Sequence, residues 1–309
     1  MELTQLRKKR IGVLAGGISS EKEISLKTGK AVFEALKSKS YQVQFLEVQD
    51  NIIETLQKAK IDIIFNALHG TWGEDGVVQS ACEMLKIPYT GSHVASSSLC
   101  MVKSWTKMVV QKEGILTPTF ILWDSSKEKV DSFMKKLSLK PPVIVKPDAQ
   151  GSTVGISIIK KFSQLKNALM VAQKFDSCVL VEGFISGKEI TASVLNGKSL
   201  PLIEIKPKSG FYDYKSKYTK GQTEYLCPAP LSKSITQKIQ NTSLKAYDIL
   251  RCRGAARSDF IVDKNNKAWF LEINTLPGMT ETSLVPKAAK EFGLSFIKLV
   301  EEILRSVDL

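Results

Sequence analysis

The sequence predicts a parallel α/β fold over residues 1–100 and an α+β fold over residues 101–309. In the first part, short apolar runs alternate with amphipathic segments, and strand–helix alternation of this kind implies an open parallel sheet. In the second part, the predicted strands follow one another with fewer helices between them. A chain of 309 residues is also long enough for about two domains, which excludes a single small core.

The first part contains four apolar runs that are typical of strands, at residues 11–15, 41–48, 61–68 and 87–90. Helical spacing of apolar residues predicts helices at residues 21–37, 52–58 and 77–85. Ligands of open parallel sheets bind at the carboxyl ends of the strands. Because Gly16-Gly17 and His69-Gly70 follow two of these strands, both pairs belong to candidate ligand loops.

The second part contains predicted strands at residues 143–146, 156–159, 178–182, 258–263 and 268–274. Predicted helices lie at residues 102–113, 163–174, 232–250 and 294–306. Residues 207–227 form a loop that is longer than most loops in compact domains. Such loops are usually lids over a site or disordered linkers.

The composition is that of a globular protein with an excess of basic residues, 44 Lys and Arg against 31 Asp and Glu. A formal charge of +13 is compatible with nucleic-acid binding. Only six of the basic residues are Arg, however, and Arg is the residue that reads bases in bidentate contacts. The charge therefore favours a Lys-rich solvated surface, and no nucleic-acid partner is expected.

No stretch reaches the roughly 18 uninterrupted apolar residues of a membrane span, so no membrane partner is expected. The five cysteines form no Cys-x-x-Cys pair and the chain has only two His, which argues against a zinc site. Both features favour the reducing cytoplasm as the compartment of this protein.

The strongest signal from the residues alone is the predicted hairpin of strands 258–263 and 268–274. A two-residue turn at Asn265-Asn266 places Asp259 opposite Glu272, with Cβ atoms roughly 5 Å apart on one face. Two facing carboxylates repel each other unless a cation lies between them. Asn274 projects from the same face, and these oxygen ligands suit Mg²⁺ above all.

Arg257 shares this face and could stabilise charge that develops on a phosphoryl or acyl oxygen. An ordinary exposed hairpin with scattered charges remains the alternative. The metal argument also fails if the turn is shifted by one residue, because a shift moves the side chains to the opposite face.

Two glycine-rich loops are further candidates for binding. Residues 150–155, Gln-Gly-Ser-Thr-Val-Gly, follow Lys146 and lie between two predicted strands. A hairpin of this kind can fold over phosphates, and a plain tight hairpin explains it equally well. Residues 69–76 contain three glycines after a strand, and a loop whose Asp75 caps the next helix is the simpler interpretation.

Two polar segments complete the set. In residues 16–23, Ser20 and Glu23 form a capping box, which leaves Glu21 at a strand's carboxyl end, where it could bind a substrate amine. Residues 206–220 carry five Lys, three Tyr and a single acid. They form either a solvated basic loop or a lid that brings positive charge over a triphosphate and excludes water.

Taken together, these residues resemble one family, the D-alanine–D-alanine ligases of the ATP-grasp superfamily, over residues 11–303. The motifs occur in the family's order: Gly16-Gly17-x-Ser19-x-Glu21-x-Glu23, His69-Gly70-x-x-Gly73-Glu74-Asp75-Gly76, Val143-Ile144-Val145-Lys146-Pro147, Gly151-Ser152-x-Val154-Gly155, Tyr212-Asp213-Tyr214-x-x-Lys217-Tyr218, Leu271-Glu272-x-Asn274-Thr275-x-Pro277-Gly278-Met279-Thr280 and Ser283-Leu284-Val285-Pro286. Val102, Gln150, Thr153, Gly183 and Ser258 stand where the family usually has other residues, yet every expected metal ligand is present.

The resemblance implies three domains. An N-terminal α/β domain that binds substrate (the pre-ATP-grasp domain) covers residues 1–100. A two-lobed ATP-grasp fold follows, with a central nucleotide-binding lobe at residues 101–185. The C-terminal lobe, residues 186–309, carries the metal site and the lid loop 207–227.

The resemblance also assigns roles to single residues. The residues expected to bind ATP are Lys103, Lys146, Ser152, Glu182, Phe184, Ile185, Glu189 and Lys217. The expected ligands of two Mg²⁺ or Mn²⁺ ions are Asp259, Glu272 and Asn274. The expected catalytic groups are Glu21, Ser152, Tyr218, Arg257 and Gly278. The expected substrate-binding residues are Glu21, His69, Arg257, Gly278, Ser283 and Leu284.

The implied activity is ATP-dependent ligation of two D-alanine molecules through an acyl phosphate, in the synthesis of peptidoglycan precursors for the cell wall. A sister enzyme that joins D-alanine to D-lactate or D-serine is the alternative, and Tyr218 in the lid favours D-alanine. The family also implies a cytoplasmic homodimer whose small-molecule partners are D-alanine and ATP.

Overall fold

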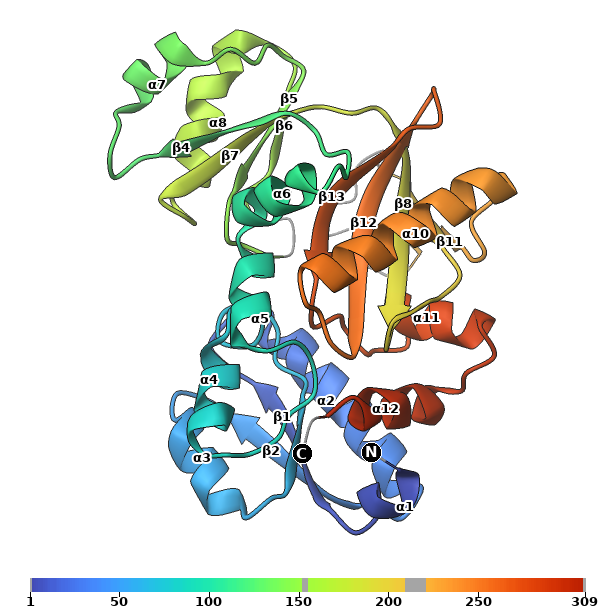
Figure 1. Cartoon of the computed structure of the whole chain (residues 1–309). Coiled ribbons are helices and arrows are strands. Elements are labelled where there is room, and N and C mark those ends of the chain that lie inside the picture. The colour runs from blue at the N-terminus through green and yellow to red at the C-terminus, as the bar shows by residue number, and fades with distance from the viewer. Residues whose placement is uncertain (1, 152–154, 209–220, 308–309) are drawn as a thin grey trace.

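The computed structural model describes residues 2–151, 155–208 and 221–307, and it is a mixed α/β protein with three sheets (Figure 1). The N-terminal sheet is parallel, with strand order β2-β1-β3. The other two sheets are antiparallel within the described residues, with orders β4-β7-β5-β6 and β11-β10-β8-β12-β13. The predicted change from a parallel α/β fold to an α+β fold is therefore confirmed.

The parallel sheet has β1 (Arg10–Gly16) at its centre, between β2 (Gln42–Val48) and β3 (Ile63–Asn66). The helices of this part are α2 (Lys22–Lys37), α3 (Ile52–Ala59) and α4 (Val77–Met84), as predicted. The strand predicted at residues 87–90 is wrong, because this segment makes only an isolated bridge between Ile64 and Tyr89. Pro88 within it has no backbone N–H to donate to a ladder.

Two short helices connect the parallel sheet to the rest of the chain. They are α5 (Val94–Met101), which the sequence pattern did not predict, and α6 (Lys103–Lys112), which corresponds to the helix predicted at residues 102–113. They are separated by Val102, whose φ of −88° and ψ of 102° are extended. In Figure 1, α6 lies between the central sheet and β13.

The central sheet consists of β4 (Phe120–Asp124), β5 (Val143–Pro147), β6 (Ser157–Ile159) and β7 (Cys178–Gly183). Its helices are α7 (Val130–Lys136) and α8 (Leu165–Ala172), the latter preceded by a 3-10 turn at residues 162–164. The sequence analysis missed β4 and α7. Both are fixed by packing, since the rings of Trp123 and Phe133 stack at 5.9 Å inside this core.

The C-terminal sheet is built around β8 (Gly187–Leu195), which pairs with β10 (Ile203–Pro207) and β12 (Ala255–Asp263). β13 (Ala268–Asn274) pairs with β12, and β9 (Lys198–Ser199) pairs with β8. β11 (Thr223–Leu226) pairs with β10, so the end of the predicted loop 207–227 is a strand instead. α10 (Lys233–Ile249) packs on this sheet.

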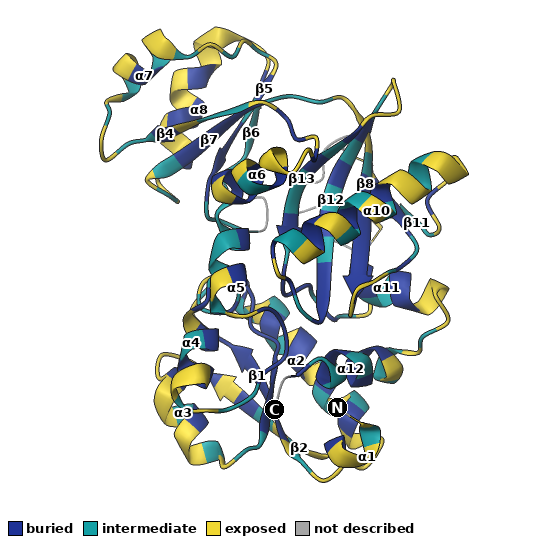
Figure 2. Ribbon diagram, viewed as in Figure 1, coloured by how far each residue is buried: buried dark blue, intermediate teal, exposed yellow. Residues whose placement is uncertain are grey.

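The end of the chain returns to its beginning. The helices α11 (Leu284–Glu291) and α12 (Phe296–Arg305), together with the short α1 (Leu3–Leu6), share one core with β1 and α2. α12 is amphipathic and buries Leu299, Val300, Ile303 and Leu304, which lie on one helical face. Figure 2 shows these buried faces turned inward and the outer faces of the peripheral helices exposed. The sequence analysis predicted α12 and missed α11.

Candidate active site

A cavity of about 140 Å³ lies where the loops after β1 and β3, the loop after β5 and the C-terminal sheet meet. Nine of the residues that the sequence assigned to the site line it: Glu21, His69, Lys103, Arg257, Glu272, Asn274, Gly278, Ser283 and Leu284. These nine residues come from segments that are more than 250 positions apart in the chain at their extremes. The tertiary structure therefore gathers the predicted substrate residues and part of the predicted metal and nucleotide sets.

Glu21 stands at the start of α2, beside two glycines. A Cβ at Gly151 would lie 2.9 Å from its Oε2 atom, and a Cβ at Gly70 would lie 3.2 Å from the same atom. Both glycines therefore leave the space that this carboxylate occupies. Because Gly151 comes from the loop after β5 and Gly70 from the loop after β3, Glu21 marks the point where these loops converge.

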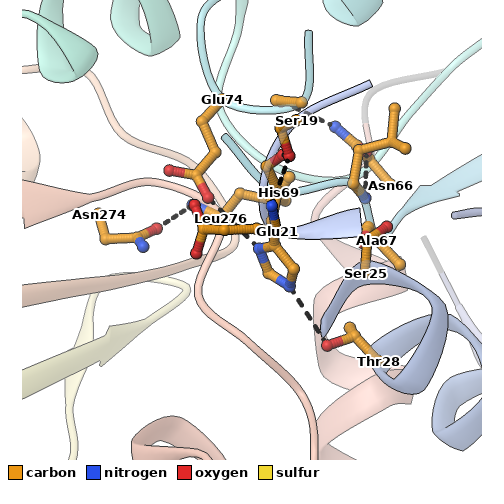
Figure 3. Close-up of polar contacts among 12 residues, drawn as sticks. Ser19, Glu21, Ser25, Thr28, Asn66, Ala67, His69, Glu74, Asn274 and Leu276 are labelled. Atoms are coloured by element: carbon orange, nitrogen blue, oxygen red, sulfur yellow. Dashed lines mark hydrogen bonds and ion pairs between the residues drawn. The ribbon is translucent and has the colours of Figure 1, made fainter. Parts of the chain in front are cut away.

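The predicted capping box of Ser20 and Glu23 is wrong, because α2 begins at Lys22 with Glu21 as its N-cap and no side-chain cap. The hydroxyl of Ser19 instead accepts a hydrogen bond from the Glu21 N–H at 3.2 Å and donates to the His69 carbonyl at 2.7 Å. This bridge fixes the loop after β1 to the loop after β3 (Figure 3). Asp75 does accept from the Val77 N–H, at 3.1 Å, as predicted, but the N-cap position of α4 is occupied by Gly76.

His69 is buried between two polar partners (Figure 3). Its Nδ1 lies 3.3 Å from Glu74 Oε1, and its Nε2 lies 3.2 Å from Thr28 Oγ1. Thr28 Oγ1 also accepts a hydrogen bond from the Met279 N–H at 3.3 Å. The hydroxyl proton of Thr28 can then face Nε2, which puts the ring proton on Nδ1, toward the carboxylate.

The loop that follows β13 forms the wall opposite Glu21. Asn274 Oδ1 accepts from the Leu276 N–H at 2.7 Å, and Ser283 Oγ accepts from the Thr280 N–H at 3.0 Å. A Cβ at Gly278 would lie 3.0 Å from Ser283 Oγ, so a small residue is needed there. Ser283 is the N-cap of α11, and the N–H groups of this helix end are suited to an anion.

The predicted pairing of Asp259 with Glu272 is present in the β12–β13 ladder. The turn is different from the prediction, because the Asp263 N–H bonds to the Lys267 carbonyl and the loop has three residues. Asn266 takes the left-handed conformation with φ of 59°. The register then shifts at Asp259/Phe260, and this bulge restores the predicted pair.

Arg257 and Asp259 form a bidentate ion pair along one strand, with both N···O distances 3.0 Å. Glu272 Oε2 lies 3.9 Å from Lys103 Nζ, and Asn274 pairs with Arg257 across the ladder. Within the described residues, no group of three or more His, Cys, Asp or Glu side chains gathers at one point. Two carboxylates and an amide on facing strands are nevertheless hard oxygen ligands that fit Mg²⁺.

Three of the residues predicted to bind ATP, Lys103, Lys146 and Glu182, belong to a cluster of buried charges next to the cavity, which Lys103 also lines. Lys103 Nζ donates to the Gln150 carbonyl at 2.6 Å. Lys146 Nζ lies 2.6 Å from Glu182 Oε2, and Lys107 Nζ lies 2.5 Å from Glu182 Oε1. All four of these charged side chains are buried.

Burial and pairing act in opposite directions on these groups. Burial lowers the pKa of Lys103 despite the nearby Glu272 carboxylate. Burial would also lower the pKa of Lys146, but Glu182 and Glu272 outweigh it and the pKa is raised. For Glu182, burial is likewise outweighed, by Lys107 and Lys146, so its pKa is lowered and the carboxylate stays ionised.

Six predicted site residues do not line the cavity: Lys146, Glu182, Phe184, Ile185, Glu189 and Asp259. Phe184 and Ile185 follow β7 directly, and Glu189 lies in β8 opposite Ile205. Ser152, Lys217 and Tyr218 lie outside the described residues.

Two residues that contact site residues, Thr28 and Lys107, were not predicted from the sequence. The sequence did contain a signal for Lys107. It follows Lys103 at i+4 in the same helix, so the two lysines share one helix face. Thr28 gave no local signal, because its partners His69 and Met279 are distant in sequence.

None of the helices in the described part of the chain combines the length and apolar character needed to cross a membrane.

Two family models match the chain, the D-ala D-ala ligase N-terminus at residues 47–92 and the D-ala D-ala ligase C-terminus at residues 109–305. The chain is 45% identical to a D-alanine–D-alanine ligase of Syntrophotalea carbinolica, over all of this chain and 99% of that protein. It is 46% identical to one of Carboxydothermus hydrogenoformans, over 96% and 97%.

Two solved structures are similar along nearly the whole chain. A D-alanine–D-alanine ligase from Bacillus anthracis complexed with ATP has a TM-score of 0.83 and 36% identity, with 96% of each chain covered. A D-Ala:D-Ser ligase from Enterococcus faecalis has a TM-score of 0.83 and 28% identity, over 96% of this chain and 98% of that one. With two matching family models and full-length relatives above 40% identity, this chain belongs to the D-alanine–D-alanine ligase family.

Proposed function

We propose that this enzyme joins two D-alanine molecules to D-alanyl-D-alanine, with ATP hydrolysed to ADP and phosphate, for peptidoglycan precursor synthesis. The observation that carries this proposal is the cavity itself. In a chain of this ligase family, it gathers a carboxylate for an ammonium group, an Arg and a glycine loop for an oxyanion, and a helix N-terminus for a carboxylate.

At the nucleotide end, Lys103 and Lys146 would bind phosphate oxygens, and Lys217 would meet the γ-phosphate. Glu182, Phe184 and Ile185 would hold the adenine, and Glu189 the ribose. Asp259, Glu272 and Asn274 would hold two Mg²⁺ ions. When bound, such ions neutralise phosphate charge. The buried lysines support this assignment, because fixed cations in a site sheltered from water attract a triphosphate strongly.

At the substrate end, Glu21 would bind the ammonium of the first D-alanine, helped by Ser152 and Tyr218. The carboxylate oxygen of this first D-alanine attacks the γ-phosphorus of ATP, and the bond between the γ-phosphorus and the ADP oxygen breaks to give an acyl phosphate. Arg257 and the Gly278 N–H face the charge that develops on the carbonyl oxygen.

The second D-alanine would place its carboxylate at Ser283 and Leu284, the N-terminus of α11, with His69 nearby. Its amine attacks the acyl carbonyl, the carbon–oxygen bond to phosphate breaks, and the released phosphate takes up the proton that the amine loses. Holding both substrates in one cavity supplies most of the rate advantage, since alignment replaces a collision of separate molecules.

A D-alanine–D-serine or D-alanine–D-lactate ligase is the second candidate, because one similar structure is a D-Ala:D-Ser ligase. The test is phosphate release by the purified protein with ATP, Mg²⁺ and D-alanine, with D-serine or D-lactate offered beside it and the products separated by mass. The dipeptide of D-alanine is expected. Preferential formation of the mixed product would favour the second candidate, and absence of phosphate release would reject both.

We also propose that the enzyme works in the cytoplasm as a homodimer. ATP and the amino acids it would join are intracellular small molecules, and the family to which the chain belongs is biosynthetic. Light scattering on the purified protein is expected to give twice the chain mass of 34.2 kDa, and a monomer mass would contradict the dimer.

A further inference from the structure

Lys107 is a fully buried cation that no part of the proposed mechanism uses. It lies on α6, which Figure 1 shows between the central sheet and β13. Its Nζ lies 2.5 Å from Glu182 Oε1 and donates to Thr117 Oγ1 at 2.8 Å. Neither Lys107 nor Thr117 lines the cavity, so Lys107 does not contact a ligand bound there directly.

Glu182 is shared between two lysines. One carboxylate oxygen faces Lys107, and the other lies 2.6 Å from Lys146 Nζ. The three side chains therefore form a string, Lys107–Glu182–Lys146, that leads from α6 through β7 to β5. With all three groups ionised, the string carries one net positive charge.

Structural stability alone is a weak reason for such a string. Burying an ion pair removes both ions from water, and apolar residues of similar volume often stabilise a fold as well or better. An ion pair of Lys146 and Glu182 alone, with no net charge, would already give each of the two groups a partner of opposite charge. The second lysine changes the net charge of the group, because without Lys107 the positive charge of Lys146 would be fully neutralised by Glu182.

We propose that Lys107 is a positioning residue of the ATP site. By holding one oxygen of Glu182, it takes up part of that carboxylate's charge and leaves Lys146 with positive charge for a phosphate oxygen of the nucleotide. This inference rests on the proposed ATP site.

The test compares Lys107→Met with the double variant Lys107→Met/Glu182→Gln. The single variant makes the string neutral, and the double variant restores the net charge of +1 while the Gln amide oxygen can still accept a hydrogen bond. In Lys107→Met, KM for ATP and the Kd for ATP in calorimetry are expected to rise about tenfold, with KM for D-alanine unchanged. Because Glu182 itself is placed in the ATP site, the double variant is compared with Glu182→Gln alone, and in that background Lys107→Met is expected to change both values by less than about threefold.

Lys136→Met is the matched control, since Lys136 belongs to the same lobe and also pairs with a glutamate at 2.6 Å, but on the surface. It is expected to leave KM for ATP unchanged. Thermal unfolding is measured for every variant, and if Lys107→Met does not fold, Lys107→Gln makes the same change of charge with a polar side chain.

Two results would overturn the inference: an unchanged Kd for ATP in Lys107→Met, or a Lys107→Met substitution that raises the Kd as much in the Glu182→Gln background as in the wild type. The second result is what a Lys107 that does not act through Glu182 predicts, because the effects of the two substitutions would then add. A wild-type protein that binds ATP without releasing phosphate would reject the proposed function instead. Its Kd values would still decide on Lys107.

Discussion

Single side chains in this cavity are held by partners from other elements, and Thr28 is the clearest case. Its hydroxyl joins His69, on the loop after β3, to the backbone of Met279, in the loop that carries Gly278. Loss of this acceptor would leave a buried N–H without a partner and loosen the loop that faces the proposed oxyanion.

Replacing Thr28 by Val, which has the same shape without the hydroxyl, is therefore expected to lower kcat/KM for D-alanine about tenfold, or about 1.4 kcal/mol. Thr28→Ser keeps the hydroxyl and is expected to stay near wild type. Initial rates of phosphate release measure both variants. Equal rates for Thr28→Val and wild type would show that the hydroxyl does not position the loop.

Glu272 tests the proposed metal site at the same scale. Glu272→Gln removes one of the two facing carboxylates, so turnover is expected to fall by at least a hundredfold with little change in thermal stability. The decrease is expected to be partly reversed by raising Mg²⁺ or Mn²⁺. Glu54→Gln, which removes a carboxylate from an exposed helical ion pair, is the control. Near-normal turnover of Glu272→Gln would contradict the metal assignment.

At the scale of elements, the hairpin of β12 and β13 has the predicted pair of carboxylates although its turn differs from the predicted one. A three-residue loop replaces the expected two-residue turn, and a bulge next to Asp259 returns the register to the predicted pair. Asp263 stabilises this loop, because its Oδ1 accepts from the Asn265 and Lys267 N–H groups at 2.8 and 2.9 Å. The burial of Phe260 against Phe270 fixes the register in the outer half of the hairpin.

Asn266 has a positive φ in this loop, so its substitutions separate backbone strain from contacts. Asn266→Ala is expected to destabilise the protein by about 1 kcal/mol, and Asn266→Gly to leave stability unchanged or slightly higher. Urea unfolding measures both. If Ala and Gly have the same effect, the left-handed conformation of Asn266 does not limit the stability of the hairpin.

At the scale of the whole molecule, the contact between Tyr41 and Glu301 joins the segment before β2 to α12. The Tyr41 hydroxyl donates to Glu301 Oε1 at 2.9 Å, and Lys298 Nζ lies 2.8 Å from Glu301 Oε2. Burial opposes the charge on Glu301, but Lys298 and Tyr41 outweigh it, so its pKa is lowered. Burial and the hydrogen bond to Glu301 raise the pKa of Tyr41 to about 12.

A lowered pKa in the folded state means that Glu301 stabilises the fold at neutral pH. This contribution is present above the ordinary glutamate pKa near 4.5 and is lost as the pH falls through the lower folded value. Tyr41→Phe is expected to cost about 1 kcal/mol at pH 7 and less below pH 4, as urea unfolding at the two pH values would show. A cost independent of pH would mean that Glu301 contributes no charge-dependent stability.

The sequence by itself determined the order of most elements, the change from a parallel to an antiparallel architecture, and the motifs of the site. These features depend on short-range periodicity and on residue chemistry, which the chain states directly. It also predicted the facing pair Asp259–Glu272, since both residues belong to one hairpin. It missed β4, α5, α7 and α11, because packing decided these segments.

Only the tertiary structure decided which residues meet. Glu21 fits between Gly70 and Gly151, Thr28 bonds to Met279, and Lys107 shares Glu182 with Lys146, over separations that no local pattern encodes. The physical reason is that burial of apolar faces, such as that of α12 against α2, is non-directional and depends on the shape of the whole fold. The site lies where several separately packed apolar cores meet and polar side chains are left facing one another.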